Sequence, residues 1–281
     1  MTILVPTDFS TYADNALQYA AGLAKQTGAE IHVVHAFDRT QLIPFTSGMF
    51  VPKEIQAVEE GAMQALKTSA AGIQQSNIRC EPVNREGSAV SVILHVIEEI
   101  KPDLVVMGTR GAAGLKELML GSTSQNVMER AGCPVLVVPE NAVYRPIRKI
   151  TYATDYHASE LPVLPQLNAV ARLLAASVTI LHGSENETRR TLEEATMNDF
   201  RNRVLNQHPD TAWNFTLAFG KNILEILEHY IHTESPDLLS ISMQHKSLAE
   251  KITGQSLTKK MLFHAHLPIL AIHSCQAVPV S

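Results

Sequence analysis

Glycine and hydroxyl residues gather in one stretch of the chain, and their spacing suits the binding of a phosphate group. Glycine lets the backbone turn at positive φ and approach a ligand without a Cβ in the way. Hydroxyl side chains before an apolar-periodic run are good helix N-caps, and a helix N-terminus presents unpaired N–H groups with partial positive charge. The stretch therefore predicts a phosphate cradle. Its residues are Gly108, Gly111, Gly121, Ser122, Thr123 and Ser124.

Two predicted strands must position this stretch. Residues 104–107 are an apolar run without helical period, which is typical of a strand buried on both faces. A parallel strand here delivers Gly108 to the carboxyl edge of its sheet, where ligands bind at the point of strand-order reversal. A similar run at 3–6 delivers Pro6, Thr7 and Asp8 to the same edge. Asp8 is open to a simpler interpretation, as a cap for the helix that begins near Ser10.

Strand-like and helix-like segments alternate along the first half of the chain. Apolar runs at 3–6, 31–36, 79–83, 104–107 and 135–138 predict strands. Helical spacing follows Ser10 as far as Gly28, covers 53–75, and resumes after Gly87-Ser88. This alternation predicts an α/β fold with an open, parallel, doubly wound sheet and right-handed crossovers.

The same series then repeats, which indicates an internal duplication. Asp8 and His35 are 27 positions apart, and so are Asp155 and His182. Pro-Asp-Leu begins a predicted strand at 102 and again at 236. We therefore predict two tandem domains, at 1–142 and 147–281, joined by a linker near 140–146.

Composition excludes several functional classes. A formal net charge of −5, a pI near 6.2 and the lack of a Lys/Arg block argue against nucleic-acid binding. No run of 18 apolar residues is present, so we expect no membrane span. Three widely spaced cysteines favour buried thiols in a reducing compartment. With no basic and apolar leader at Met1, we expect a cytoplasmic protein.

The pattern Gly108-x2-Gly111-x9-Gly121-Ser122 resembles the nucleotide-binding motif of the ATP-binding branch of the universal stress protein family. The opening residues 3–10 are similar to that family's first strand and its acidic residue. The resemblance covers the first half closely and the second half more loosely. It implies two Rossmann-like domains of the adenine-nucleotide alpha hydrolase type.

The resemblance also implies a role for each candidate residue. Asp8 and the neighbouring backbone of Pro6 and Thr7 would hold the ribose and adenine, and Val34 and Met107 would line an apolar base pocket. Met107 is equally well explained as plain core. The phosphates would lie among seven residues, namely Gly108, Arg110, Gly111, Gly121, Ser122, Thr123 and Ser124. The implied ligand is ATP, with or without Mg²⁺, although AMP or another adenine nucleotide fits the same pattern.

The duplicated copy of the glycine loop has changed. Ser242 stands opposite Gly108 and His245 opposite Gly111, while Gly254 alone resembles Gly121. Side chains at these positions would occupy the phosphate space. We therefore expect the first domain to bind nucleotide and the second domain not to bind it.

No catalytic apparatus is evident in the sequence. There is no P-loop, no Gly-x-Ser-x-Gly elbow and no metal-binding pattern among the twelve histidines. The leading hypothesis is a stress-response regulator that binds an adenine nucleotide, with at most weak ATPase activity. The alternatives are a slow ATP hydrolase or nucleotidyl-transfer enzyme, and a nucleotide-independent scaffold for an unknown protein partner. Residues 135–138 and 269–272 resemble the family's dimerisation strands, which implies an intramolecular pseudo-dimer and allows a homodimer.

Overall fold

The computed structural model describes residues 1–38, 52–109, 121–156, 158–243 and 267–273. These residues divide into two compact units, of which unit 1 extends to Tyr144 and unit 2 starts at Arg145. The predicted phosphate residues Arg110 and Gly111 lie outside the described residues, as do His245 and Gly254.

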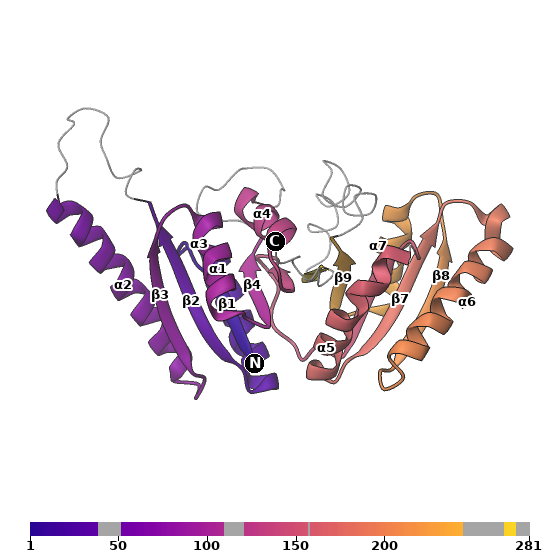
Figure 1. Cartoon of the computed structure of the whole chain (residues 1–281), viewed down its shortest axis with the longest axis horizontal. Helices are drawn as coiled ribbons and strands as arrows, with labels where there is room; N and C mark the ends of the chain where they lie inside the picture. Colours follow the sequence, from indigo (N-terminus) through magenta and orange to yellow (C-terminus); the bar gives the residue numbers. More distant parts are fainter. Residues whose placement is uncertain (39–51, 110–120, 157, 244–266, 274–281) are drawn as a thin grey trace, which may run out of the picture. The chain divides into compact units, whose positions relative to one another are not determined.

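Unit 1 alternates strands and helices, as predicted (Figure 1). Its strands follow the order β3-β2-β1-β4-β5, and all four pairings are parallel. Helix α1 packs against β1 and β4, α2 packs against β2 and β3, and α3 contacts α4. The elements are β1 (Thr2–Pro6), α1 (Thr11–Thr27), β2 (Glu30–Phe37), α2 (Pro52–Gln74), β3 (Cys80–Glu86), α3 (Ala89–Ile100), β4 (Leu104–Gly108), α4 (Ser122–Arg130) and β5 (Val135–Val138).

Local sequence explains where α1 begins and ends. Ser10 is its N-cap, and the Ser10 hydroxyl accepts a hydrogen bond from the amide of Ala13. Gly28 closes the helix in the left-handed region at φ 72°, where a residue without a Cβ is not strained. Both ends agree with the predicted boundaries.

Unit 2 repeats the strand order of unit 1, as β8-β7-β6-β9-β10. All of its strand pairs are parallel as well. The α/β class and the two duplicated parallel sheets are thus confirmed. The elements are β6 (Lys149–Thr154), η2 (Ala158–Val163), α5 (Leu164–Leu174), β7 (Ser177–Ser184), η3 (Glu187–Arg189), α6 (Arg190–Gln207), β8 (Trp213–Phe219), α7 (Ile223–Glu234), β9 (Leu238–Ser242) and β10 (Ile269–Ile272).

The register of the central strands is the same in both units. Ile3 of β1 pairs with Leu104 of β4, and Ile150 of β6 pairs with Leu238 of β9. Continuing both registers places Ser242 at the position of Gly108, as the sequence alignment predicts. The units differ at the first helix, because η2, a 3₁₀ segment containing Pro162, precedes α5.

Two cysteines, Cys80 and Cys133, are buried and carry free thiols. Burial raises the pKa of the Cys80 thiol to about 11 and that of Cys133 to about 12. Both stay protonated at neutral pH, which makes them inert core residues. None of the helices in the described part of the chain combines the length and the apolarity that a membrane span requires.

We expect Gly22 to be essential for packing in unit 1. A Cβ on Gly22 would lie 2.2 Å from the Tyr144 ring, which also packs edge-on against Tyr19 with ring centroids 5.1 Å apart. Gly22→Ala should therefore lower the free energy of unfolding by about 1–3 kcal/mol, because the aromatic ring must move. Urea unfolding followed by far-UV circular dichroism measures this change.

Gly61 is the matched control, because it also lies inside a helix but a Cβ there meets nothing within 4 Å. Gly61→Ala should raise stability by about 0.5–1 kcal/mol. Equal stability of the Gly22→Ala variant and the unaltered protein would contradict the packing argument.

Candidate functional site

The candidate site lies where β1 and β4 run side by side. In the order β3-β2-β1-β4-β5 the crossovers reverse direction between these two strands, which is where open α/β sheets bind ligands. Their carboxyl ends deliver Pro6, Thr7 and Asp8 from β1, and Met107 and Gly108 from β4. The structure thus brings both predicted strand ends to one edge.

Hydrogen bonds join the start of α4 to the end of β4. The amide of Gly121 donates to the carbonyl of Thr109 at 2.7 Å. The hydroxyl of Ser124, which is 3% exposed, donates to the carbonyl of Gly108 at 2.8 Å. The described residues of the two halves of the glycine pattern therefore lie against each other. The phosphate cradle itself stays a prediction.

The start of α4 differs from the prediction in one respect. Gly121 is the N-cap, with φ −63° and ψ 146°, so Ser122, Thr123 and Ser124 are the first three helical residues and not the caps. Gly121 has no side chain that could accept a hydrogen bond, so no N-cap side chain occupies the amides of the first turn. This start therefore keeps donors that an anion can use.

Gly108 does not have the positive φ that we expected of it, and Gly121 lies before the helix, as predicted. Gly121 lies in the extended region, and Gly108 is not among the residues with positive φ. Gly108 is required for another reason, because a Cβ there would lie 2.8 Å from the carbonyl oxygen of Tyr12. The missing side chain lets β4 end against the start of α1.

Asp8 takes part in the start of α1. Its Oδ1 accepts hydrogen bonds from the amide of Ser10 at 3.1 Å and from the hydroxyl of Ser10 at 2.6 Å. The simpler interpretation of Asp8 as a support for the helix start thus agrees with the geometry. Asp8 is nevertheless exposed at the edge of the sheet, so contact with a ligand is compatible with this role.

Phe9 and His35 belong to the same edge, although we assigned them no role in the site. Phe9 has φ 61°, which is unusual for an aromatic residue, and its ring lies 4.4 Å from the His35 ring. The Nδ1 of His35 is 2.8 Å from the carbonyl oxygen of Thr7. Because a carbonyl only accepts, Nδ1 carries a proton and Nε2 is the acceptor in the neutral ring.

The second unit repeats this arrangement. Tyr156 has φ 58°, its ring lies 4.5 Å from that of His182, and His182 Nδ1 is 2.8 Å from the carbonyl oxygen of Thr154. One signal in the sequence could have identified these histidines as part of the edge. The Asp-to-His spacing is equal in both halves, and it places each histidine beside the turn that follows the first strand.

Val34 and Met107 are part of the sheet core. Their side chains are only 1% and 4% exposed. The carbonyl of Val34 accepts a hydrogen bond from the amide of Thr7 at 2.8 Å. The side chains therefore support the strands that form the edge, and a role for these two residues beside an adenine base stays a prediction.

The corresponding edge of unit 2 carries a cavity of about 270 Å³ beyond β6 and β7. Three carboxylates line it, from Asp155, Glu185 and Glu193, and the described lining contains no lysine or arginine. His182 Nε2 lies 3.3 Å from Glu193 Oε2. This lining is unfavourable for a phosphate group because like charges repel.

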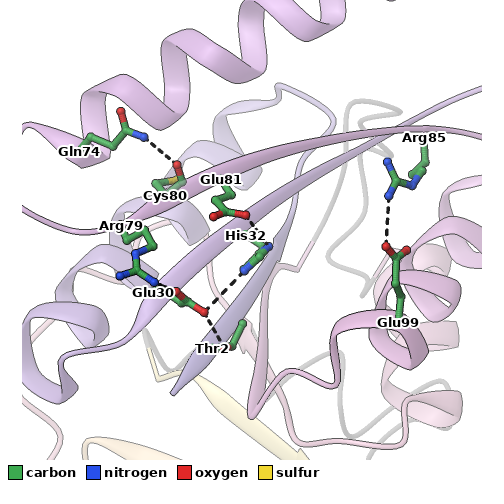
Figure 2. A network of polar contacts seen from close by, with 9 residues as sticks. All are labelled: Thr2, Glu30, His32, Gln74, Arg79, Cys80, Glu81, Arg85 and Glu99. Carbon is green, nitrogen blue, oxygen red and sulfur yellow. Dashed lines mark hydrogen bonds and ion pairs between the residues drawn. The ribbon is translucent and has the colours of Figure 1, made fainter.

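The histidines of the described chain do not form a metal centre. Figure 2 shows His32 between Glu30 and Glu81, with nitrogen–oxygen distances of 3.9 Å to each. Within the described residues no three His, Cys, Asp or Glu side chains are arranged to hold a metal ion.

Comparison with known proteins gives consistent matches. The sequence profile of the universal stress protein family matches residues 1–139. A universal stress protein of Methanocaldococcus jannaschii is 30% identical over 136 residues, which cover 48% of this chain and 80% of the relative. A universal stress protein of Thermus aquaticus is 34% identical over 138 residues, which cover 49% of this chain and 97% of the relative.

Several solved structures match both units together. The crystal structure of a universal stress protein from Archaeoglobus fulgidus covers 97% of this chain and 98% of its own, with a TM-score of 0.71 at 19% identity. At this identity the match shows the fold alone. The sequence relatives and the profile match together show that this chain belongs to the universal stress protein family.

Proposed function

We propose that unit 1 binds ATP, or another adenine nucleotide, beyond the carboxyl ends of β1 and β4, and that the protein acts as a stress-response regulator with little or no catalysis. The observation that carries this proposal is the pair of hydrogen bonds that hold the start of α4 against the end of β4. They place a helix N-terminus at the switch point of the sheet.

The start of α4 suits a phosphate group. Its first-turn amides face no capping side chain from Gly121, and the helix dipole adds partial positive charge at this end. Ser122 is exposed and Thr123 half-buried, so both hydroxyls can donate to phosphate oxygens. By the family resemblance, Arg110 and Gly111 would complete the phosphate site, and Mg²⁺ would enter bound to the phosphates.

Asp8 suits the sugar of the same ligand. Its carboxylate is exposed at the carboxyl end of β1, and its Oδ1 already accepts from Ser10. A carboxylate has about four acceptor positions, so a ribose hydroxyl can donate to it without displacing Ser10. The adenine would then lie along the ends of β1 and β2.

Binding without turnover favours a regulatory role. The sequence has no P-loop lysine and no evident base to activate a water molecule. A bound nucleotide then acts by stabilising one conformation or assembly over another, in proportion to its differential affinity for the two. In unit 2, Ser242 and the acidic cavity argue against a second nucleotide site.

Gly121→Glu should weaken ATP binding at least about tenfold, since a carboxylate beside the phosphates adds like-charge repulsion. The backbone at Gly121 has φ −63°, which any residue adopts, so the change does not strain the loop. Gly121→Gln is the matched control, with the same size and no charge. Calorimetric titration with ATP measures both variants.

A Glu variant that binds ATP as tightly as both the Gln variant and the unaltered protein would show that the phosphates lie elsewhere. Loss of binding in both variants to the same extent would indicate obstruction by side-chain size, with no contribution from charge.

Asp8→Asn separates the two roles of Asp8. The amide keeps an acceptor oxygen for Ser10, so stability should change by less than about 1 kcal/mol. ATP affinity should fall about tenfold, because a hydrogen bond to a charged acceptor is worth about 1.5–3 kcal/mol. Asp8→Ala should lose affinity and also stability. Unchanged affinity in the Asn variant would leave Asp8 as a helix support only.

A further inference from the structure

Unit 2 contains a buried acidic side chain where unit 1 has alanine. Thr154 corresponds to Thr7, because each hydroxyl accepts a hydrogen bond from the amide two residues later. With the same offset, Glu160 of η2 takes the place of Ala13. Glu160 is only 1% exposed, so its polar groups depend on protein partners.

Hydroxyl groups of β6 satisfy one oxygen of this carboxyl group. Oε2 of Glu160 accepts hydrogen bonds from the hydroxyl of Tyr152 at 2.9 Å and from the hydroxyl of Thr154. Tyr152 is fully buried and stands at the position of Val5 of unit 1, so both members of this polar pair occupy positions that are apolar in unit 1. Ser242 at the end of β9 also hydrogen-bonds Tyr152.

The other oxygen, Oε1, is buried and has no hydroxyl or amide donor in the described chain. The side chain of Asp155 lies close enough to Glu160 for a hydrogen bond between the two carboxyl groups. Two carboxylates have no proton to share, so this hydrogen bond exists only when one of them is protonated. The arrangement is that of a carboxyl pair that holds a single proton.

We propose that Glu160 and Asp155 share one proton at neutral pH, and that its loss under alkaline conditions releases η2 from β6, which makes unit 2 a proton-sensitive element of the protein. The proposal is independent of nucleotide binding in unit 1. Its structural basis is the junction itself, because Glu160 joins η2 to β6 through the hydroxyls of Tyr152 and Thr154 and lies beside Asp155, the residue that follows the strand.

Burial, followed by the hydrogen bond to Asp155, raises the pKa of the Glu160 carboxyl to about 8. Because this folded-state pKa exceeds the ordinary value of 4.5, the proton stabilises unit 2 fully below pH 4.5 and is lost as pH rises through about 8. Between these limits each pH unit lowers the folded-to-unfolded ratio by up to about tenfold.

The surrounding groups do not offset this effect. Tyr152 has a pKa raised well above 10 by burial and by the charge of Glu160, so it stays neutral. His182, Glu185 and Glu193 line the same cavity as Asp155. The negative charges of the two glutamates disfavour further negative charge at Asp155. A second carboxylate at Glu160 would meet repulsion from Asp155 at close range.

Hydrogen exchange at residues 150–163 tests the proposal in the full chain between pH 6 and pH 9, after correction for the intrinsic exchange rate. In the unaltered protein, protection of this segment should fall about tenfold between pH 7 and pH 9. Residues 3–16 of unit 1 are the internal control and should keep their protection, since Val5 and Ala13 carry no titrating group there.

Glu160→Gln is the matched variant. Its amide nitrogen donates to Asp155 permanently, and its oxygen accepts from Tyr152 and Thr154, so protection should become independent of pH. Equal pH dependence in this variant, or no pH dependence in the unaltered protein, would overturn the proposal. Should the variant fail to fold, Tyr152→Val with Glu160→Ala restores the apolar pair of unit 1 and should give the same pH-independent result.

Nuclear magnetic resonance of the labelled carboxyl carbon of Glu160 provides the direct measurement. Titration of Glu160 near pH 8, moving to lower pH in an Asp155→Asn variant, is the expected result. Ionisation of Glu160 below pH 6 would overturn the proposal.

Discussion

The close approach of β4 to the start of α1 is the constraint on which the candidate site depends. A Cβ at Gly108 would lie 2.8 Å from the carbonyl oxygen of Tyr12, so only glycine lets the strand end at this point. Ser124 then donates to the carbonyl of Gly108, and the start of α4 is held against the same strand end. The packing of β4 against the start of α1, together with the buried hydroxyl of Ser124, thus places the N-terminus of α4 at the switch point of the sheet.

The duplication shows how this constraint can be lost. Unit 2 keeps the turn after its first strand, with Tyr156 at φ 58° stacked on His182 as Phe9 is stacked on His35. Ser242 stands at the position of Gly108, and η2 takes the place of the first turns of α1. The same frame therefore supports two different chemistries, the start of α4 with its glycine N-cap in unit 1 and a buried carboxyl group in unit 2.

Much of the fold could be predicted from the sequence because its signals are local. The all-buried run of β4, the Ser10 cap and the Gly28 stop each depend on neighbouring residues. The repeated Asp-to-His spacing indicated the duplication, and the alignment of Pro102 with Pro236 placed Ser242 opposite Gly108, which the strand register confirms. Strand order follows from these elements because parallel strands joined by helices have few arrangements.

What could not be predicted depends on contacts between distant residues. Gly108 appeared to provide positive φ or room for a ligand, whereas its actual neighbour, the backbone of Tyr12, lies almost a hundred positions away. Ser124 appeared to be a cap, but its hydroxyl bonds to a carbonyl 16 positions earlier. Glu160 was not singled out, because one glutamate in sequence carries no sign of its burial.

The measurement that tests the central claim most directly is the number of adenine nucleotides bound per chain. One portion of freshly purified protein is denatured, and the released nucleotide is identified by chromatography. A second portion, freed of nucleotide, is titrated with ATP. Our account predicts one adenine nucleotide per chain, bound in unit 1 and released largely unhydrolysed. Two equivalent sites, or a protein that is purified empty and does not bind added ATP, would contradict it.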